Sequence, residues 1–378
     1  MKAIVLTFDC LPLRLLGCYG NQNIETPHFD RSAANAIVLD AHFGENFDAS
    51  ASSHAWWTGR YQFPRSPKQQ RGQESLGRML SEVGVALQMI SERSATTPGA
   101  DLQKGWHTTA VGSASRAGAD PTQTHFGRLV DEAQKHFEGM AANTGASQLL
   151  WLRATGFDLS DTQQDSETAL AAFARGITTI DRELGRLLEI MAEYVNPADL
   201  LFILTSSQGA DLGERAGRNS PSIQLSEGVV HVPLIVRLPN GEMGSRRACL
   251  TQSVDIVPTL LEWFGVDAAR HALEGRSLLP TVFGTAIDER EHVCLGIGDR
   301  ERAIRTRDFY LVEHCSHREP GDAATENDQQ GSDTAYLFKK PDDRFDIHNV
   351  AQQFPGVCEQ LRRSLEGFAA QFGPPAAG

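Results

Sequence analysis

The sequence predicts an α/β fold in which a mostly parallel, mixed β-sheet lies between helices. The first observation is a set of short, continuously apolar runs, each bounded by polar or turn residues, at positions 3–8, 149–152, 200–205, 232–236 and 293–297. Such runs are typical of strands that are covered on both faces. The second observation is that segments with helical spacing separate these runs, and this alternation indicates a largely parallel sheet.

The first element is a buried strand close to the amino terminus. Its apolar stretch has six residues and no small-residue cleavage site follows it, so it does not predict a secretory leader. Nowhere does an apolar run approach the ~20 residues that a membrane-spanning helix needs. We therefore expect a soluble, cytoplasmic protein without a membrane partner.

Two segments carry the clearest helical pattern. Over residues 168–191, apolar side chains recur at three- and four-residue spacing and form a single stripe. A second, shorter helix is predicted after Asp255, through Phe264. Each of these helices can cover one part of the sheet.

After about residue 281 the pattern of alternating strands and helices ends. Residues 303–312 and 334–339 are typical of antiparallel strands, with a polar insert at 316–333 between them. A final helix is predicted over about 355–372. We therefore expect a main α/β domain over residues 1–285, followed by a small subdomain over 286–378 that combines an antiparallel sheet with a helix.

Composition excludes several classes of protein. The chain has 378 residues with 35 Lys and Arg against 48 Asp and Glu, which gives a net charge of −13. A nucleic-acid partner would require a basic face, so we expect none. Hydrophobic residues at 40% and charged residues at 22% are ordinary for a folded protein. The six cysteines contain no C-x-x-C pair and are predicted to be reduced thiols.

Polar residues follow two of the predicted strands. Asp9 comes at the end of the first strand, and Ser207 and Gln208 follow residues 200–205. In an open α/β sheet, ligands bind beyond the carboxyl ends of the strands. We therefore expect these residues to mark the candidate site.

Several motifs spread over the chain occur in the order in which sulfatases carry them. They are LTFDCL at 6–11, LGCYGN at 16–21, TPHFDR at 26–31, TGRY at 58–61, VPLI at 232–235, SVDIVPTLL at 253–261, LEGRSL at 273–278 and DIHN at 346–349. The sequence therefore resembles the sulfatase family of the alkaline-phosphatase superfamily. The resemblance implies the α/β sandwich of that family and the hydrolysis of sulfuric esters.

The resemblance also implies which positions should carry the chemistry. Sulfatases use a cysteine or serine converted to formylglycine, within a Cys/Ser-x-Pro-x-Arg motif, and a calcium ion that holds the nucleophile and the sulfate. Counting back from Thr58-Gly59-Arg60 places the nucleophile on Ala49, the proline on Ala51 and the arginine on Ser53. None of these residues is the type that the family uses, and alanine cannot be a nucleophile.

The metal and anion positions are replaced in the same way. The family's aspartate and its neighbour fall on Ser207 and Gln208, its Lys-x-His falls near Glu92 and Ser94, and a later lysine falls near Ser222. Asp9 alone remains from the metal set, and one carboxylate holds a divalent cation poorly. We therefore expect no cofactor, with calcium or another divalent cation present only if the protein is active.

Four residues near these positions are open to more than one interpretation. Asp9 is either a metal ligand or a residue that caps the following turn. Ser50 becomes the modified serine if the alignment slips by one residue, at the expense of the spacing to Thr58-Gly59-Arg60. Ser50, Ser52 and Ser53 either cap a helix that runs through Trp57 or present backbone amides to an anion.

Two cationic side chains nearby are open to interpretation as well. His54 and Arg60 are candidates for binding an anion. The alternative for Arg60 is a structural guanidinium that packs and bonds to backbone carbonyls.

Two functions of different class follow from these observations. The first is a catalytically inactive sulfatase-like protein that binds an unidentified protein or a small anionic ligand. The second is a metal-dependent hydrolase of sulfate, phosphate or phosphonate esters with a rebuilt active site. The missing nucleophile and ligands favour the first, because any hydrolytic mechanism still requires a nucleophile and charge stabilisation.

Overall fold

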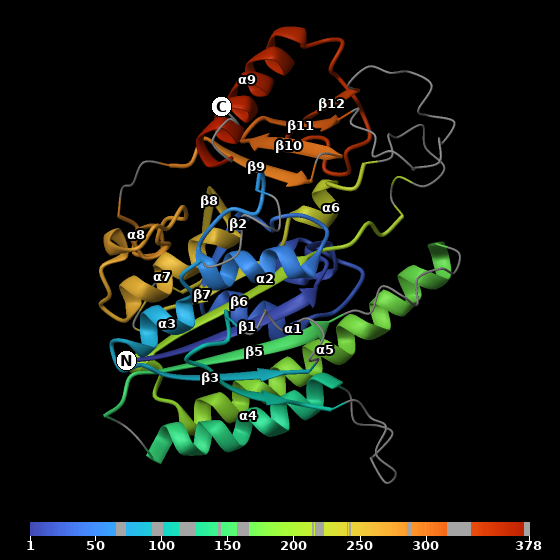
Figure 1. Cartoon of the computed structure of the whole chain (residues 1–378). Coiled ribbons are helices and arrows are strands. Elements are labelled where there is room, and N and C mark those ends of the chain that lie inside the picture. Colours follow the sequence, from blue (N-terminus) through green and yellow to red (C-terminus); the bar gives the residue numbers. More distant parts are fainter. Residues whose placement is uncertain are drawn as a thin grey trace.

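The computed structural model describes residues 1–65, 73–92, 101–112, 125–142, 145–156, 166–213, 215, 223–239, 241, 243–285, 289–298, 300–315 and 334–373. Within these residues the chain forms two sheets (Figure 1). The larger has eight strands in the order β4-β3-β5-β1-β6-β7-β2-β8, and the smaller has four in the order β12-β11-β10-β9. Ser94 and Ser222 lie outside the described residues.

The larger sheet is mostly parallel, as the sequence predicts. Its strands are β1 (Lys2–Cys10), β2 (Ile37–Phe43), β3 (Ala86–Ser91), β4 (His107–Ala110), β5 (Gln148–Gly156), β6 (Leu200–Gln208), β7 (Leu234–Arg237) and β8 (Ser245–Gln252). Strand β7 runs antiparallel to both β6 and β2, and the other pairs are parallel. The predicted mixed sheet is therefore confirmed.

Helices cover both faces of this sheet (Figure 1). One face packs against α1 (Pro27–Ala34), α4 (His125–Ala142) and α5 (Ser166–Tyr194), and the other against α2 (Ala49–Thr58), α3 (Leu76–Ser81), α7 (Ile256–Trp263) and α8 (Leu279–Val282). On β1, Ile4 and Leu6 face the first group while Ala3 and Val5 face the second. Because alternate side chains enter two cores, four consecutive positions of the strand, 3–6, are apolar.

The smaller sheet is antiparallel and follows in the chain. It contains β9 (His292–Ile297), β10 (Glu301–Thr306), β11 (Phe309–His314) and β12 (Ala335–Lys339). Helix α9 (Pro355–Phe372) packs on it through Leu361, Leu365 and Phe368. This arrangement confirms the antiparallel sheet and closing helix, while the boundary between residues 285 and 286 stays a prediction.

Two details of the sequence prediction require correction. Residues 293–297 were grouped with the strands of the parallel sheet, but β9 pairs antiparallel with β10 in the second sheet. An apolar run has the same appearance in either sheet, because the pattern does not record the pairing partner. Residues 303–312 are not one strand, because β10 ends at Thr306 and β11 begins at Phe309.

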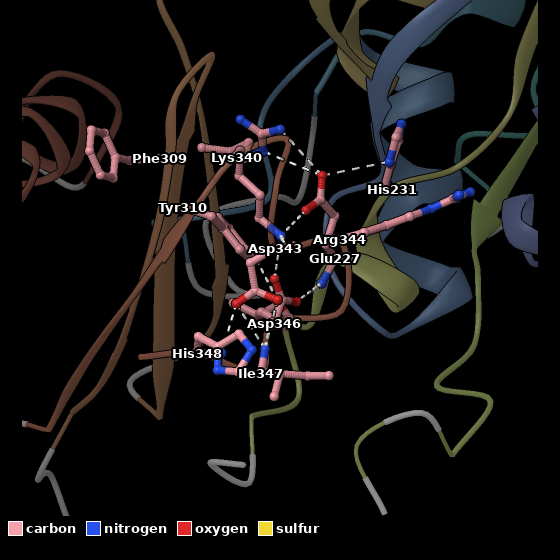
Figure 2. A network of polar contacts seen from close by, with 12 residues as sticks. Glu227, His231, Phe309, Tyr310, Lys340, Asp343, Arg344, Asp346, Ile347 and His348 are labelled. Carbon is pink, nitrogen blue, oxygen red and sulfur yellow. Dashed lines mark hydrogen bonds and ion pairs between the residues drawn. The ribbon is translucent and has the colours of Figure 1, made fainter. Parts of the chain in front are cut away.

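An ion network joins the second sheet to helix α6 (Glu227–Val230) (Figure 2). The ammonium of Lys340, just after β12, contacts the Glu227 carboxylate and lies 2.5 Å from Oδ1 of Asp346. Arg305 on β10 lies 3.3 Å from Oε1 of Glu227. Burial opposes the ionisation of Glu227, but these two cations prevail and lower its pKa.

Candidate functional site

The candidate site lies where β1, β5 and β6 end and α2 begins. Thr7 of β1 pairs with Arg153 of β5 and with Thr205 of β6. Because these neighbouring strands are parallel and in register, Asp9, Arg153 and Ser207 reach the same edge of the sheet. Within the described residues, no helix combines the length and the apolar character that crossing a membrane requires.

An ion pair between Asp9 and Arg153 occupies this edge. Nη2 of Arg153 lies 3.3 Å from Oδ1 of Asp9 and donates to Oγ of Ser53 at 2.8 Å. The Arg153 side chain is 2% exposed and that of Asp9 is 13% exposed. Burial lowers the pKa of Arg153, and the Asp9 carboxylate opposes this shift by favouring the charged guanidinium.

The two serines next to this pair are engaged in different ways. Oγ of Ser52 donates to the carbonyl oxygen of Ser207 at 2.9 Å and accepts from the backbone N–H of Glu45 at 3.1 Å. Oγ of Ser207 is buried and has no hydrogen-bond partner among the residues that the structure describes. A Cβ atom at Gly44 would collide with the Ser207 carbonyl, so this close approach of chains requires glycine.

Helix α2 begins at Ala49, one residue before the serine run. The Asp48 side chain caps it by accepting from the backbone N–H of Ser50 at 2.8 Å. Oγ of the exposed Ser50 donates to Oδ2 of Asp48 at 2.7 Å. The interpretation in which the serines cap the helix is therefore wrong. The Asp48 carboxylate, one residue before the helix, accepts from the free backbone N–H of Ser50 instead.

The remaining predicted residues surround this centre. Nδ1 of His54 lies 2.9 Å from Nε2 of Gln62, which also donates to the carbonyl oxygen of Arg60 at 3.1 Å. His54 and Arg60 are thus linked through one glutamine side chain. Gln208 ends β6, and its carbonyl oxygen accepts from the backbone N–H of Leu11 at 3.0 Å.

Glu92 also lies at this edge, one residue beyond β3. Its backbone N–H donates to the Arg153 carbonyl at 3.0 Å, and its Oε2 accepts from the backbone N–H of Thr155 at 2.9 Å. Burial raises the pKa of Glu92, and the nearby Asp9 carboxylate raises it further. This position therefore carries a buried carboxyl group.

The residues present do not fit the calcium ion that sulfatases use. The Asp9 carboxylate already has the Arg153 guanidinium as its countercharge, and that cation would repel a divalent ion placed beside it. Ser207 and Gln208 contribute no negative charge. In the part of the chain that the structure describes, no group of three or more His, Cys, Asp or Glu side chains could hold a metal ion.

The family assignment follows from a family-wide comparison. The model named Sulfatase matches residues 4–266, which is more than half of the chain. The chain belongs to the sulfatase family. Membership places it in the alkaline-phosphatase superfamily, and it confirms the resemblance that the ordered motifs indicate.

Individual relatives of this sulfatase-family chain are distant. The multifunctional alkaline phosphatase superfamily protein PehA of Trinickia caryophylli is 34% identical over 117 residues, which cover 29% of this chain and 21% of PehA. Arylsulfatase K of Danio rerio is 27% identical over 184 residues, which cover 48% of this chain and 34% of that protein. The matched segments therefore span about a third or less of these relatives.

Solved structures confirm the fold of this family member. The phosphonate monoester hydrolase of Agrobacterium radiobacter superimposes with a TM-score of 0.73 at 16% identity, covering 98% of this chain and 96% of that one. At this level of identity the likeness concerns the fold.

Arg153 is the site residue that the sequence analysis missed. It stands directly after the apolar run 149–152. An arginine in a strand that is covered on both faces requires a buried countercharge. That requirement was the available signal, and Asp9 on the adjacent strand meets it.

Proposed function

We propose that this protein is a catalytically inactive member of the sulfatase family that binds a small anionic ligand without a divalent cation. The observation that carries the proposal is the buried contact of Arg153 with both Asp9 and Ser53. The permanently charged guanidinium of Arg153 replaces the calcium ion of sulfatases as the countercharge of Asp9.

The state of the hydroxyl groups supports the absence of catalysis. The position at which the family carries its nucleophile is expected to be Ala49. The Ser53 hydroxyl accepts a hydrogen bond from the Arg153 guanidinium. The Ser52 hydroxyl donates a hydrogen bond to the backbone carbonyl oxygen of Ser207, which cannot act as a base. A nucleophilic hydroxyl requires a base that takes its proton.

An exposed cation supports an anionic ligand. Arg175 on α5 is exposed and lines a cavity to which Glu92 also contributes. Guanidinium groups bind sulfate, phosphate and carboxylate through paired N–H donors. A protein with a net charge of −13 requires such local positive charge to bind an anion.

The decisive experiment measures metal content and turnover on the same preparation. We expect no stoichiometric metal by inductively coupled plasma mass spectrometry. We also expect no turnover of 4-nitrophenyl sulfate, 4-nitrophenyl phosphate or a phenylphosphonate ester with added calcium, magnesium or manganese. Stoichiometric metal together with turnover that Asp9→Ala abolishes would overturn the proposal.

One contact favours the second candidate function, a hydrolase with a rebuilt site. Oγ of Ser50 donates to a carboxylate oxygen of Asp48, which is the geometry of a hydroxyl next to a base. If the esters are turned over, Ser50→Ala should abolish activity under this hypothesis. The exposed position of Ser50 makes this substitution mild for folding.

A further inference from the structure

A cavity of about 390 Å³ lies between the end of β3 and the helices α4 and α5. Its lining includes Glu92 after β3, Phe126 on α4, and Arg175, Thr179 and Ile180 on α5. The elements that meet there can be followed in Figure 1. The volume suits a small molecule.

One of the side chains that line the cavity has a polar atom without a hydrogen-bond partner among the described residues. Glu92 is 6% exposed, and its Oε2 accepts from the backbone N–H of Thr155, whereas its Oε1 is buried and has no such partner. A buried polar atom without a partner costs about 1–3 kcal/mol. Such an atom in a cavity marks the place where a ligand can supply the missing hydrogen bond.

Two arginines offset the nearby Asp9 carboxylate around this carboxyl group. Arg175 lines the cavity, its side chain is exposed, and among the described residues no acidic side chain pairs with it. On α4, the guanidinium nitrogens of Arg128 are buried and have no hydrogen-bond partner within the described part of the chain. Arg128 lies near enough to Glu92 to lower the pKa of that carboxyl group, against the larger effect of burial.

Two apolar side chains complete the wall. Phe126 is 5% exposed and Ile180 is 7% exposed, and both line the cavity. They offer contact to carbon atoms of a ligand but no hydrogen bonds. A ligand that fits therefore has an anionic group, a carbon frame and a hydroxyl group.

We propose that this cavity binds a small organic anion that carries a hydroxyl group, with the anion on Arg175 and the hydroxyl on Oε1 of Glu92. The proposal deepens the proposed function, on which it rests, by naming the cavity and the class of ligand. It assigns Arg175 and Glu92 as binding residues, and Phe126 as the contact for the carbon frame.

Isothermal titration calorimetry on the full chain tests this assignment with three probes. Glucose 6-phosphate carries both groups, inorganic phosphate carries the anion alone, and glucose carries the hydroxyls alone. We expect glucose 6-phosphate to bind most tightly. Arg175→Gln should weaken it about tenfold, because a hydrogen bond to a charged group is lost.

The two binding residues should respond differently to the probes. Glu92→Gln should weaken glucose 6-phosphate and leave inorganic phosphate unchanged, whereas Arg175→Gln should weaken both. Arg182→Gln is the matched control, because Arg182 lies on the same helix, is 67% exposed and pairs with Glu183. This control should bind like the wild-type protein.

The outcomes separate this inference from the proposed function. Wild-type protein that binds none of the probes, or an Arg175→Gln variant with unchanged affinity, overturns the cavity assignment while leaving the inactive site intact. Measured ester turnover overturns the inactive site instead, and the Arg175 and Glu92 variants then still decide the assignment through their effect on KM.

Discussion

Replacing Lys340 by methionine removes the cation at the centre of the ion network in Figure 2. The Lys340 side chain is 1% exposed and its ammonium contacts both Glu227 and Asp346. Methionine has a similar length and fills the same space, so the substitution mainly tests the charge. The network joins α6 to the segment that follows the second sheet. Removing the charge should therefore weaken the attachment of these two segments and lower the stability of the fold.

The expected magnitude follows from the charges that remain. In the wild-type protein two cations, Lys340 and Arg305, face two carboxylates, Glu227 and Asp346. The substitution leaves two buried carboxylates with one guanidinium. Removing one partner of a buried ion pair costs about 3–5 kcal/mol. We therefore expect Lys340→Met to lower the free energy of unfolding by about 3–5 kcal/mol.

Urea denaturation followed by far-ultraviolet circular dichroism measures this loss. Lys339→Met is the matched control, because Lys339 is 57% exposed and pairs at 3.2 Å with an Asp342 that is 70% exposed. Such a surface pair contributes at most about 1 kcal/mol. Adding Asp346→Asn to Lys340→Met should recover part of the loss. If Lys340→Met costs no more than Lys339→Met, the network does not stabilise the fold as argued.

Three further predictions concern groups near the site. Burial raises the pKa of Glu45 to about 8 from an ordinary 4.5, so stability is lost as pH rises between these values. Glu45→Gln should remove this loss, up to about 1.4 kcal/mol per pH unit in urea titrations. Gly44→Ala should destabilise by about 1–3 kcal/mol through its clash with Ser207, whereas Gly139→Ala, with open space in α4, should stabilise by about 0.5–1 kcal/mol. The Cys10 thiol is 1% exposed and burial raises its pKa, so it should resist alkylation until the protein unfolds.

The sequence predicts the elements whose patterns are long or fully apolar. The helix expected over 168–191 is α5, which runs from Ser166 to Tyr194, and the last helix matches α9. Strands that contain polar residues lack the continuous apolar run by which the sequence predicts a strand. Strand β4 (His107–Ala110) is an edge strand with mostly exposed side chains, and β2 contains Asp40 and His42. An edge strand does not require the apolar run that marks a central one.

For the candidate site as well, the sequence predicts some features and leaves others open. The order of the motifs placed Asp9, Ala49 and Ser207 on a sulfatase scaffold without reference to a structure. It could not predict how the serines of α2 are bonded, because Asp48 competes with them for the free N–H group. The motifs also place Glu92 near the position of the family's lysine, but they do not predict the cavity that Glu92 lines.

The sequence by itself determined the family and the covered sheet, and it predicts which residues replace the nucleophile and the metal ligands. The tertiary structure decided that Asp9 meets Arg153, a residue 144 positions away in the chain. Periodicity reports which side chains are buried, because burial repeats with the geometry of the strand or helix. It does not report which buried charges meet, because that depends on the register between strands distant in sequence.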